Sequence, residues 1–348
     1  MSGLFHRALR GEPVAAPPIW LMRQAGRYHA PYQQLRARHS FEALCRTPDL
    51  AAEVTMGPVL DFDFDAAILF SDLLFPLEAL GFGLSYDDGP PKLDGSLTFD
   101  RIARFRPIDE ALARLAFQRD AMQATRLRLP AAKGLIGFVG GPWTLFVYAV
   151  EGTHAGPLAR AKSSLGLYRA FAERMVPLLL ENIRLQFEGG ADIVMIFDTA
   201  AGELAPDVFA AQMAPDLATL AETFPDRLGY YAKGLRAGHL DSRTADGRTH
   251  FLDAPWAGLG LDMRWNLAEA LTNRPGRGFV QGNFDPASLH LTGPALETEI
   301  ERFLAPVRRL DPEARRGWIC GLGHGVLPGT PESSVRTFVN RVRGAFAQ

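Results

Sequence analysis

Two arginines separated by a short, flexible segment are the first residues of the chain that could bind a charged ligand. Arg23 and Arg27 flank the tripeptide Gln24, Ala25 and Gly26, directly after a predicted strand. A guanidinium is a planar fork that pairs with a carboxylate through two hydrogen bonds, and Gly26 lets the backbone approach a ligand closely. Two such forks suit a ligand with several carboxylates. The alternative is a pair of surface arginines in salt bridges, which add little stability.

A carboxylate, Asp72, follows the apolar run Ala66–Phe70. A carboxylate beside a buried strand is costly unless hydrogen-bond donors surround it. Asp72 could accept hydrogen bonds from the N–H groups of a ligand and stabilise positive charge that develops nearby. It could equally be the N-cap of the helix that follows, which is a common position for Asp.

Aromatic residues follow the glycines that end a later strand. Pro142 begins a predicted helix there, and Tyr148 lies one to two turns into it, so its hydroxyl could face the strand ends. The alternative is that Phe138, Trp143 and Tyr148 are all core aromatics.

A histidine stands among glycines near the end of the chain, in the run from Gly321 to Gly325. The flexible glycines could place the ring of His324 against a ligand, or the segment could be a turn with a solvated histidine. Cys320 and His324 are too few ligands for a closed zinc site. No metal site is therefore predicted.

Short apolar runs alternate along the chain with longer segments of helical period. The predicted strands are Pro18–Met22, Ala66–Phe70, Gly134–Phe138, Asp192–Phe197, Leu228–Ala232, Gly258–Leu261, Gly278–Gln281 and Trp318–Cys320. The predicted helices are Pro48–Phe62, Ile108–Arg128, Leu165–Phe187, Asp207–Thr223, Asn266–Leu271, Pro286–Leu304 and Pro331–Phe346. The segment Leu84–Arg106 has alternating residues around Asp-Asp-Gly-Pro-Pro, which predicts a small inserted hairpin.

Eight strands separated by helices predict a single (β/α)8 barrel of the TIM type over residues 1–348. A doubly wound open sheet is the alternative, but neither G-x-G-x-x-G after the first strand nor G-x-x-x-x-G-K-[ST] occurs. Barrel enzymes carry their chemistry at the carboxyl ends of the strands. The candidate residues above all follow predicted strands, although strands of many proteins simply end in turn residues.

Composition excludes several classes of function. The 348 residues carry 37 Lys and Arg against 39 Asp and Glu, a net charge of −2, so no global positive field attracts nucleic acid or an anionic membrane. Two cysteines cannot build a disulfide framework and indicate a reducing, cytoplasmic location. Met1–Arg10 has no apolar signal core, and the longest apolar stretch, Phe138–Val150, is shorter than the roughly 20 residues that span a bilayer.

Longer motifs give the chain a family resemblance. The run that ends at Tyr28 reads PPIWLMRQAGRY, and residues 137–152 read GFVGGPWTLFVYAVEG. Both resemble the signatures of uroporphyrinogen decarboxylases. In the order of that family there follow AAILFSDLL, IFDTAAGEL, YYAKG, GLGLD, QGNFDP and GLGHGVLPGTP. The resemblance extends from Phe5 to Phe346.

The resemblance implies a cytoplasmic, cofactor-free enzyme of tetrapyrrole biosynthesis with a (β/α)8 fold, usually a homodimer. Such enzymes convert the four acetate side chains of uroporphyrinogen III to methyls, giving coproporphyrinogen III. By the same resemblance Arg23 and Arg27, with Gln24, Ala25 and Gly26 between them, hold substrate carboxylates.

Further site residues are implied in the same way. Asp72 matches the aspartate that binds the pyrrole N–H groups, and Tyr148 and His324 match positions that contact substrate. Phe41 matches a phenylalanine of the cleft wall, and Thr199 stands where the family usually has Ser.

The sequence also departs from the family. Tyr28 is followed by His-Ala-Pro-Tyr in place of Leu-Pro-Glu-Tyr, the stretch to Phe41 is one residue shorter, and Gly321 replaces an Asn. These changes affect loop contacts and leave Arg23, Arg27 and Asp72 in place.

Two other functions are compatible with such a chain. One is a related cobalamin-dependent methyltransferase, which needs a His/Cys zinc site. The other is a non-catalytic tetrapyrrole-binding protein. For the decarboxylase the proton donor stays open among His324, Tyr148 and water, because an arginine with a pKa above about 12 is a poor acid.

Overall fold

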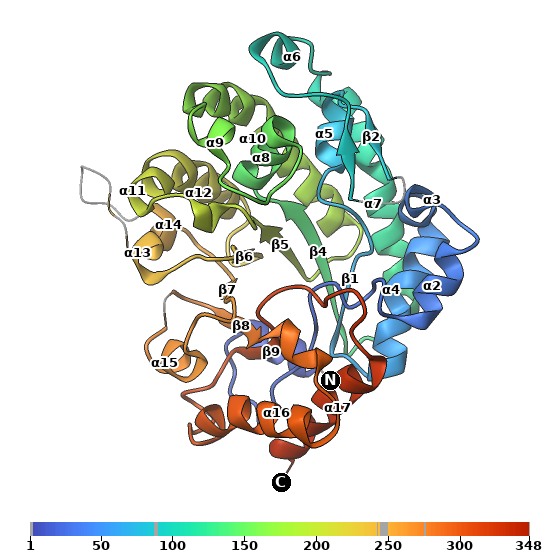
Figure 1. The fold of residues 1–348 in the computed structure, drawn as a ribbon, viewed down its shortest axis with the longest axis vertical. Helices are drawn as coiled ribbons and strands as arrows, with labels where there is room; N and C mark the ends of the chain where they lie inside the picture. Colours follow the sequence, from blue (N-terminus) through green and yellow to red (C-terminus); the bar gives the residue numbers. More distant parts are fainter. Residues whose placement is uncertain (1–2, 87–89, 242, 244–249, 275, 348) are drawn as a thin grey trace.

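The computed structural model describes residues 3–86, 90–241, 243, 250–274 and 276–347. Seven parallel strands form the central sheet in the order β1-β4-β5-β6-β7-β8-β9 (Figure 1). They are β1 (Ala66–Ile68), β4 (Gly134–Gly140), β5 (Ile193–Phe197), β6 (Leu228–Tyr231), β7 (Gly258–Gly260), β8 (Phe279–Phe284) and β9 (Trp318–Leu322). The strands β2 (Leu84–Ser85) and β3 (Lys92–Leu93) form a separate antiparallel pair.

Helices surround this sheet (Figure 1). They are α1 (Leu4–Leu9), α2 (Ala30–Arg36), α3 (Phe41–Arg46), α4 (Pro48–Phe62), α5 (Phe75–Leu80), α6 (Phe99–Ala103), α7 (Ile108–Arg128), α8 (Pro142–Glu151), α9 (Ala159–Lys162), α10 (Leu165–Glu188), α11 (Pro206–Val208), α12 (Ala214–Thr223), α13 (Ala237–Leu240), α14 (His250–Asp253), α15 (Leu267–Thr272), α16 (Gly293–Arg308) and α17 (Glu332–Ala345). Shorter turns are η1 (Ala201–Glu203), the π-turn η2 (Phe209–Met213) and η3 (Pro286–His290).

Seven of the eight predicted strands are confirmed, and the first is reduced to a bridge between Ile19 and Cys320. The backbone of residues 18–20 bonds on one side to Cys320 and on the other to Asp65, whose nitrogen lies 2.8 Å from the Ile19 carbonyl oxygen. Pro18 has no N–H to donate, and the Ile19 N–H donates to the Asp65 carboxylate instead of a strand. The segment is therefore short, and it lies between β9 and the residues that lead into β1.

The predicted helices Pro48–Phe62 and Ile108–Arg128 are confirmed with the same bounds as α4 and α7. The pattern Asp207–Thr223 is interrupted by the π-turn η2. Pro215 follows that turn, and its ring clashes with the carbonyl four residues earlier, which an α-helix cannot accommodate.

Two more predictions are right only in part. Pro286–Leu304 divides into η3 and α16, because α16 makes a fresh start at Gly293 with a proline in its first turn. The insertion Leu84–Arg106 does begin as the hairpin β2–β3, with residues 87–89 outside the described part. Its second half is helix α6, which begins where the Thr98 hydroxyl accepts the Arg101 amide.

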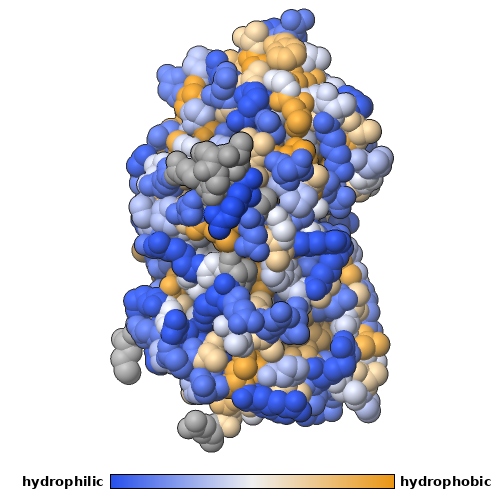
Figure 2. All heavy atoms as spheres, turned by 90° about the vertical axis from the view of Figure 1, so that its left-hand side faces the viewer, coloured by the Kyte–Doolittle hydropathy of each residue, from blue (hydrophilic) through white to orange (hydrophobic). Residues whose placement is uncertain are grey.

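Strand β5 shows how the core is built. Ile193, Met195 and Phe197 belong to one buried cluster, and Val194 and Ile196 belong to the other. Successive side chains of a strand point to opposite faces, so both faces of β5 are buried, which explains its unbroken apolar run. Outside, hydrophilic residues cover most of the face seen in Figure 2. No helix among the described residues is long and apolar enough to span a membrane.

Candidate active site

The candidate residues gather where the parallel strands end. Asp72 follows β1, Thr199 follows β5 and His324 follows β9, while Tyr148 lies on α8, which follows β4. Parallel neighbours point the same way, so these carboxyl ends lie at one edge of the sheet. The polar residues predicted from separate stretches of sequence are therefore brought to one region.

Arg23 is the charge that links these residues. Its guanidinium acts electrostatically on Asp72, Tyr148, His154 and His324. It is exposed and forms no ion pair with another described residue. A cation at the strand ends with no anionic partner among the described residues is free to bind an anionic ligand.

The backbone of Arg23 is unusual as well. Its φ is +60°, in the left-handed region that a residue with a side chain rarely adopts. In the loop after β9, a Cβ at Gly325 would lie 2.5 Å from Cδ of Arg23. Gly325 therefore leaves the space in which the arginine side chain lies.

Arg27 is exposed too, but its charge acts on a different group, the Tyr32 hydroxyl of α2. It forms no ion pair with another described residue, and its carbonyl accepts a hydrogen bond from the Gln33 amide at 2.6 Å. The structure thus separates the two arginines: Arg23 lies with the carboxylate and the histidines, and Arg27 lies at the side of α2.

The residues between the arginines fix the backbone. Gln24 is fully buried, accepts the Leu21 amide and donates to the Ala66 carbonyl at 3.0 Å. Its own carbonyl accepts the Tyr28 hydroxyl at 2.7 Å. The Gln24 side chain therefore holds the arginine segment to β1, whereas Ala25 and Gly26 are partly exposed.

Asp72 is partly buried, and its Oδ1 accepts the Leu74 amide at 2.8 Å. This is a local turn two residues long, so the N-cap interpretation is wrong: α5 begins later, after Leu74, without a side-chain cap. Burial raises the pKa of Asp72 above its usual range, and the Leu74 amide, the Tyr86 hydroxyl and the Arg23 charge act against that rise.

Aromatic side chains border this carboxylate. Phe41, at the start of α3, packs on Phe70 with ring centroids 5.4 Å apart and on Tyr86 at 4.6 Å. The Tyr86 hydroxyl acts electrostatically on Asp72. Phe41 is thus placed in an aromatic group that extends to the strand end bearing Asp72.

Tyr148 is the only residue of Pro142–Val150 that is not buried. Trp143 is fully buried, as the core interpretation expects, whereas Phe138 and Tyr148 are partly exposed and pack against the core. The Tyr148 hydroxyl lies 2.5 Å from Nδ1 of His154. Burial raises the pKa of Tyr148 to about 12, so the phenol is protonated at neutral pH.

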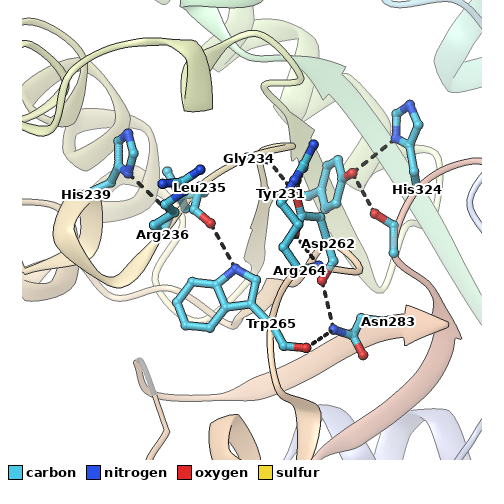
Figure 3. A network of polar contacts seen from close by, with 11 residues as sticks. Tyr231, Gly234, Leu235, Arg236, His239, Asp262, Arg264, Trp265, Asn283 and His324 are labelled. Atoms are coloured by element: carbon cyan, nitrogen blue, oxygen red, sulfur yellow. Dashed lines mark hydrogen bonds and ion pairs between the residues drawn. The ribbon is translucent and has the colours of Figure 1, made fainter. Parts of the chain in front are cut away.

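His324 stacks on Tyr231, with ring planes 13° apart (Figure 3). The Tyr231 hydroxyl donates its one proton to the Gly323 carbonyl at 2.9 Å and lies 3.1 Å from Nδ1 of His324. Nδ1 must therefore carry a proton and donate it to Tyr231, which leaves Nε2 as an acceptor. Burial, Arg23 and Lys233 lower the pKa of His324 to about 4, so the ring is neutral at pH 7.

A second cation, Lys233, follows β6 and forms no ion pair with another described residue. The turn after it is fixed by Asp262, whose Oδ2 accepts the Gly234 amide at 2.7 Å and pairs with Arg264 (Figure 3). Asn283 holds the Asp262 carbonyl at 2.8 Å. These contacts position a lysine at the same strand ends as Arg23.

Residues 2–345 match the family described as uroporphyrinogen decarboxylase. The chain belongs to the uroporphyrinogen decarboxylase family. The uroporphyrinogen decarboxylase of Anaeromyxobacter sp. (strain Fw109-5) is 37% identical over an alignment of 362 residues, which covers 100% of this chain and 99% of that one. The uroporphyrinogen decarboxylase of Trichlorobacter lovleyi is 34% identical, and the alignment covers 98% of each of the two chains. This member of the uroporphyrinogen decarboxylase family is thus a carboxy-lyase.

Solved structures share the fold of this uroporphyrinogen decarboxylase family member. A methyltransferase from Methanosarcina mazei aligns with a TM-score of 0.75 at 20% identity, over 100% of both chains. A B12-independent methionine synthase from Shewanella sp. aligns with a TM-score of 0.53 at 15% identity, over 95% of this chain and 94% of that one. Identities this low show a common fold alone. Among the described residues no group of three or more His, Cys, Asp or Glu side chains is arranged to hold a metal ion.

Three residues of the candidate site were not predicted as members of it: His154, Tyr231 and Lys233. Tyr231 and Lys233 had a signal, since both lie in YYAKG at a predicted strand end. His154 had none, because only the folded loop after α8 brings it back to Tyr148.

Proposed function

We propose that this decarboxylase removes CO2 from the four acetate side chains of uroporphyrinogen III and gives coproporphyrinogen III, a step of tetrapyrrole and haem biosynthesis. The observation that carries the proposal is that an arginine without an ion-pair partner among the described residues and a partly buried carboxylate lie at the same strand ends, within electrostatic reach of each other. Arg23 offers a fork for carboxylates, and Asp72 offers an anion to the pyrrole N–H groups.

The chemistry needs an electron sink, and the substrate itself can provide one. Protonation of a pyrrole α-carbon makes the ring an iminium-like cation. The acetate C–C bond then breaks, CO2 leaves, and the bonding electrons enter the ring. Protonation of the resulting methylene carbon and loss of the α-proton complete the methyl group, so each cycle consumes one proton net and releases one CO2.

Asp72 stabilises the cationic ring in this proposal. An ionised carboxylate opposite a positive ring lowers its energy, and about 4 kcal/mol would give roughly a thousandfold in rate. The raised pKa of Asp72 fits an anion that awaits a cationic partner, since the charge of the ring would favour ionisation.

Arg23 and Arg27 bind different carboxylates of the substrate. Arg23 acts beside Asp72, on the acetate that reacts, and Arg27 acts toward α2, on side chains farther from the reaction. Lys233 adds a third positive charge. Gln24, Ala25 and Gly26 set the backbone between the arginines, and the first of these does so through its buried side chain.

Phe41, which packs on Phe70 and Tyr86, forms one part of the wall of the site, and Thr199, which follows β5, forms another. His324 takes up the α-proton, because its Nε2 is unprotonated and its ring is neutral. Tyr148 keeps its proton at neutral pH and is the proposed donor; because burial disfavours the phenolate, it needs a partner that returns a proton to it.

We extend the proposal to architecture and location. The segment Pro18–Trp20 is proposed as the eighth strand of a single (β/α)8 barrel over residues 1–348. Its backbone hydrogen bonds to Cys320 on one side and to Asp65 on the other support this. A cytoplasmic homodimer follows from the family resemblance.

One assay tests the function. The protein is incubated without oxygen with uroporphyrinogen III, and CO2 release and the number of carboxylates in the product are followed, with Asp72→Asn as the matched control. Loss of four carboxylates by the wild type alone supports the proposal. Binding without CO2 release would favour a non-catalytic tetrapyrrole-binding protein. Stoichiometric zinc with methyl transfer would favour the methyltransferase alternative.

A further inference from the structure

A histidine outside the family motifs contacts the site. His154 lies in the loop between α8 and α9, and its Nδ1 is 2.5 Å from the Tyr148 hydroxyl. The two ring centroids are 5.2 Å apart. Among the described residues, this is the only hydrogen bond of the Tyr148 hydroxyl. His154 therefore sets the direction of the phenol O–H bond.

The chain reaches this contact through a reversal at the end of α8. Gly152 has φ +78°, the left-handed conformation that ends helices, and its amide returns to the Tyr148 carbonyl at 2.9 Å. Two residues later His154 is half-buried, while Thr153 and Ala155 on either side of it are exposed. His154 therefore stands between solvent and a phenol that lies at the strand ends.

Four groups face the imidazole: Arg23, Lys233, His324 and the Tyr148 phenol. Burial lowers the pKa of His154, and the charges of Arg23 and Lys233 lower it further. The imidazole is therefore neutral at pH 7, with one nitrogen protonated and one free. A neutral imidazole can accept a proton at one nitrogen while it donates one from the other, which is the property of a relay.

We propose that His154 is a positioning residue that holds the Tyr148 hydroxyl and resupplies it with protons from solvent. Tyr148 in turn protonates the methylene carbon of the substrate after CO2 has left. This inference rests on the proposed function. It assigns the proton donor of the reaction and gives it a route to water. His324, with its free Nε2, serves the opposite transfer.

The transfer is balanced. The phenol O–H bond breaks as the new C–H bond forms at the methylene carbon that CO2 has left, which keeps the one proton that each cycle consumes. The Nδ1–H bond of His154 breaks as the phenol O–H bond forms again, and Nε2 takes a proton from water. The imidazole stays neutral, exchange of its protons with water restores the first tautomer, and one proton has entered from solvent.

Three variants separate this arrangement from a structural contact. His154→Ala removes both the hydrogen bond and the relay. His154→Asn keeps an amide at the position of Nδ1, which can hold the hydroxyl but cannot pass a proton. Ala155→Ser is the matched control, because it alters an exposed side chain of the same loop and leaves the Thr153 hydroxyl to accept the Ala155 amide. Turnover of uroporphyrinogen III and its KM are measured for each, with added imidazole as a second readout.

We expect kcat of His154→Ala and His154→Asn to fall about a hundredfold, KM to change less than about twofold, and Ala155→Ser to match the wild type. Imidazole in solution should restore turnover to His154→Ala and leave His154→Ala/Tyr148→Phe inactive. Wild-type turnover in His154→Asn, or no rescue of His154→Ala, would overturn the relay. If the wild type itself releases no CO2, the proposed function has failed rather than this inference.

Discussion

Oδ1 of Asp198 lies 2.8 Å from the backbone nitrogen of Thr144, so a carboxylate at the end of β5 caps helix α8. The N-cap residue of that helix, Gly141, has no side chain to do this. A Cβ there would lie 2.2 Å from Cγ of Asp198, so the glycine makes room for the carboxylate. Because α8 carries Tyr148, Asp198 fixes the helix that positions the proposed proton donor.

Asp198→Ala should destabilise the protein by about 2 kcal/mol, because it leaves the buried Thr144 amide without an acceptor. Asp198→Asn keeps an oxygen in the same place and should lose less. Urea unfolding at one pH measures both. Equal losses in the two variants would mean that the hydrogen bond is not what stabilises the helix.

The charge of Asp198 should make stability fall with rising pH. Burial raises the pKa of Asp198 from 3.8 to about 6, against hydrogen bonds from Thr144 and Tyr230. A carboxyl whose pKa is higher in the folded state stabilises the fold when protonated. That stability is full below about pH 4 and is lost as the pH rises through about 6.

The difference between 6 and 3.8 is about two pKa units, or up to about 3 kcal/mol. The wild type should lose up to that amount, relative to Asp198→Asn, between about pH 4 and pH 7. Urea titrations of the two proteins across this range measure it. Parallel pH curves would show that Asp198 is ionised in the fold throughout.

Periodicity predicted most of the fold, because β5 and its neighbours are buried on both faces and read as apolar runs. It failed at Pro18–Met22, where Pro18 has no N–H to donate and the Ile19 N–H donates to the Asp65 carboxylate instead of a strand. Spacing predicted Arg23 and Asp72 as candidates but not that the Arg23 charge acts on Asp72, because the fold brings together segments that are separate in the sequence. It could not find His154 or the Asp198 cap, since both contacts join residues through turns or separate elements.

Asp72→Asn should fold normally and lose about a thousandfold in kcat, because it removes the anion opposite the cationic ring. The pKa of Asp72 is raised, mainly by burial, so the acid limb of the wild-type kcat/KM profile should lie above the usual range of an aspartate. The exposed Asp207→Asn is the control. Near-wild-type turnover by Asp72→Asn would remove Asp72 from the mechanism.

Arg23→Ala should lower kcat/KM by about ten- to a hundredfold, as expected for the loss of one charge-assisted pair worth about 1.5–3 kcal/mol. Arg27→Ala should raise KM with less effect on kcat, because Arg27 acts toward Tyr32 rather than Asp72. Steady-state kinetics of the two variants checks this division. Identical losses in kcat for both arginines would contradict it.

Gly325→Ala tests the placement of Arg23 without removing its charge. The added Cβ would meet Cδ of Arg23 at 2.5 Å and displace the side chain. We expect kcat/KM to fall about tenfold with little change in Tm, since a flexible side chain can move aside. A normal kcat/KM would show that the position of the guanidinium is not critical.

The hydrogen bond between Tyr231 and His324 predicts which imidazole nitrogen is protonated. The Tyr231 hydroxyl donates its only proton to the Gly323 carbonyl, so it can only accept at its contact with Nδ1 of His324. His324 must therefore be protonated at Nδ1 and free at Nε2. Nitrogen NMR of the wild type should show this tautomer, and Tyr231→Phe should lose the preference and about tenfold in kcat. The His324 resonance should titrate near pH 4 in both proteins, because burial is the main cause that lowers the pKa of His324 to about 4. This lowered pKa makes His324 stabilise the fold above about pH 6.5, a contribution lost as the pH falls toward 4. A wild-type ring protonated at Nε2 would reverse the donor and acceptor at this contact, and with it the assignment of His324 as the group that takes up the α-proton.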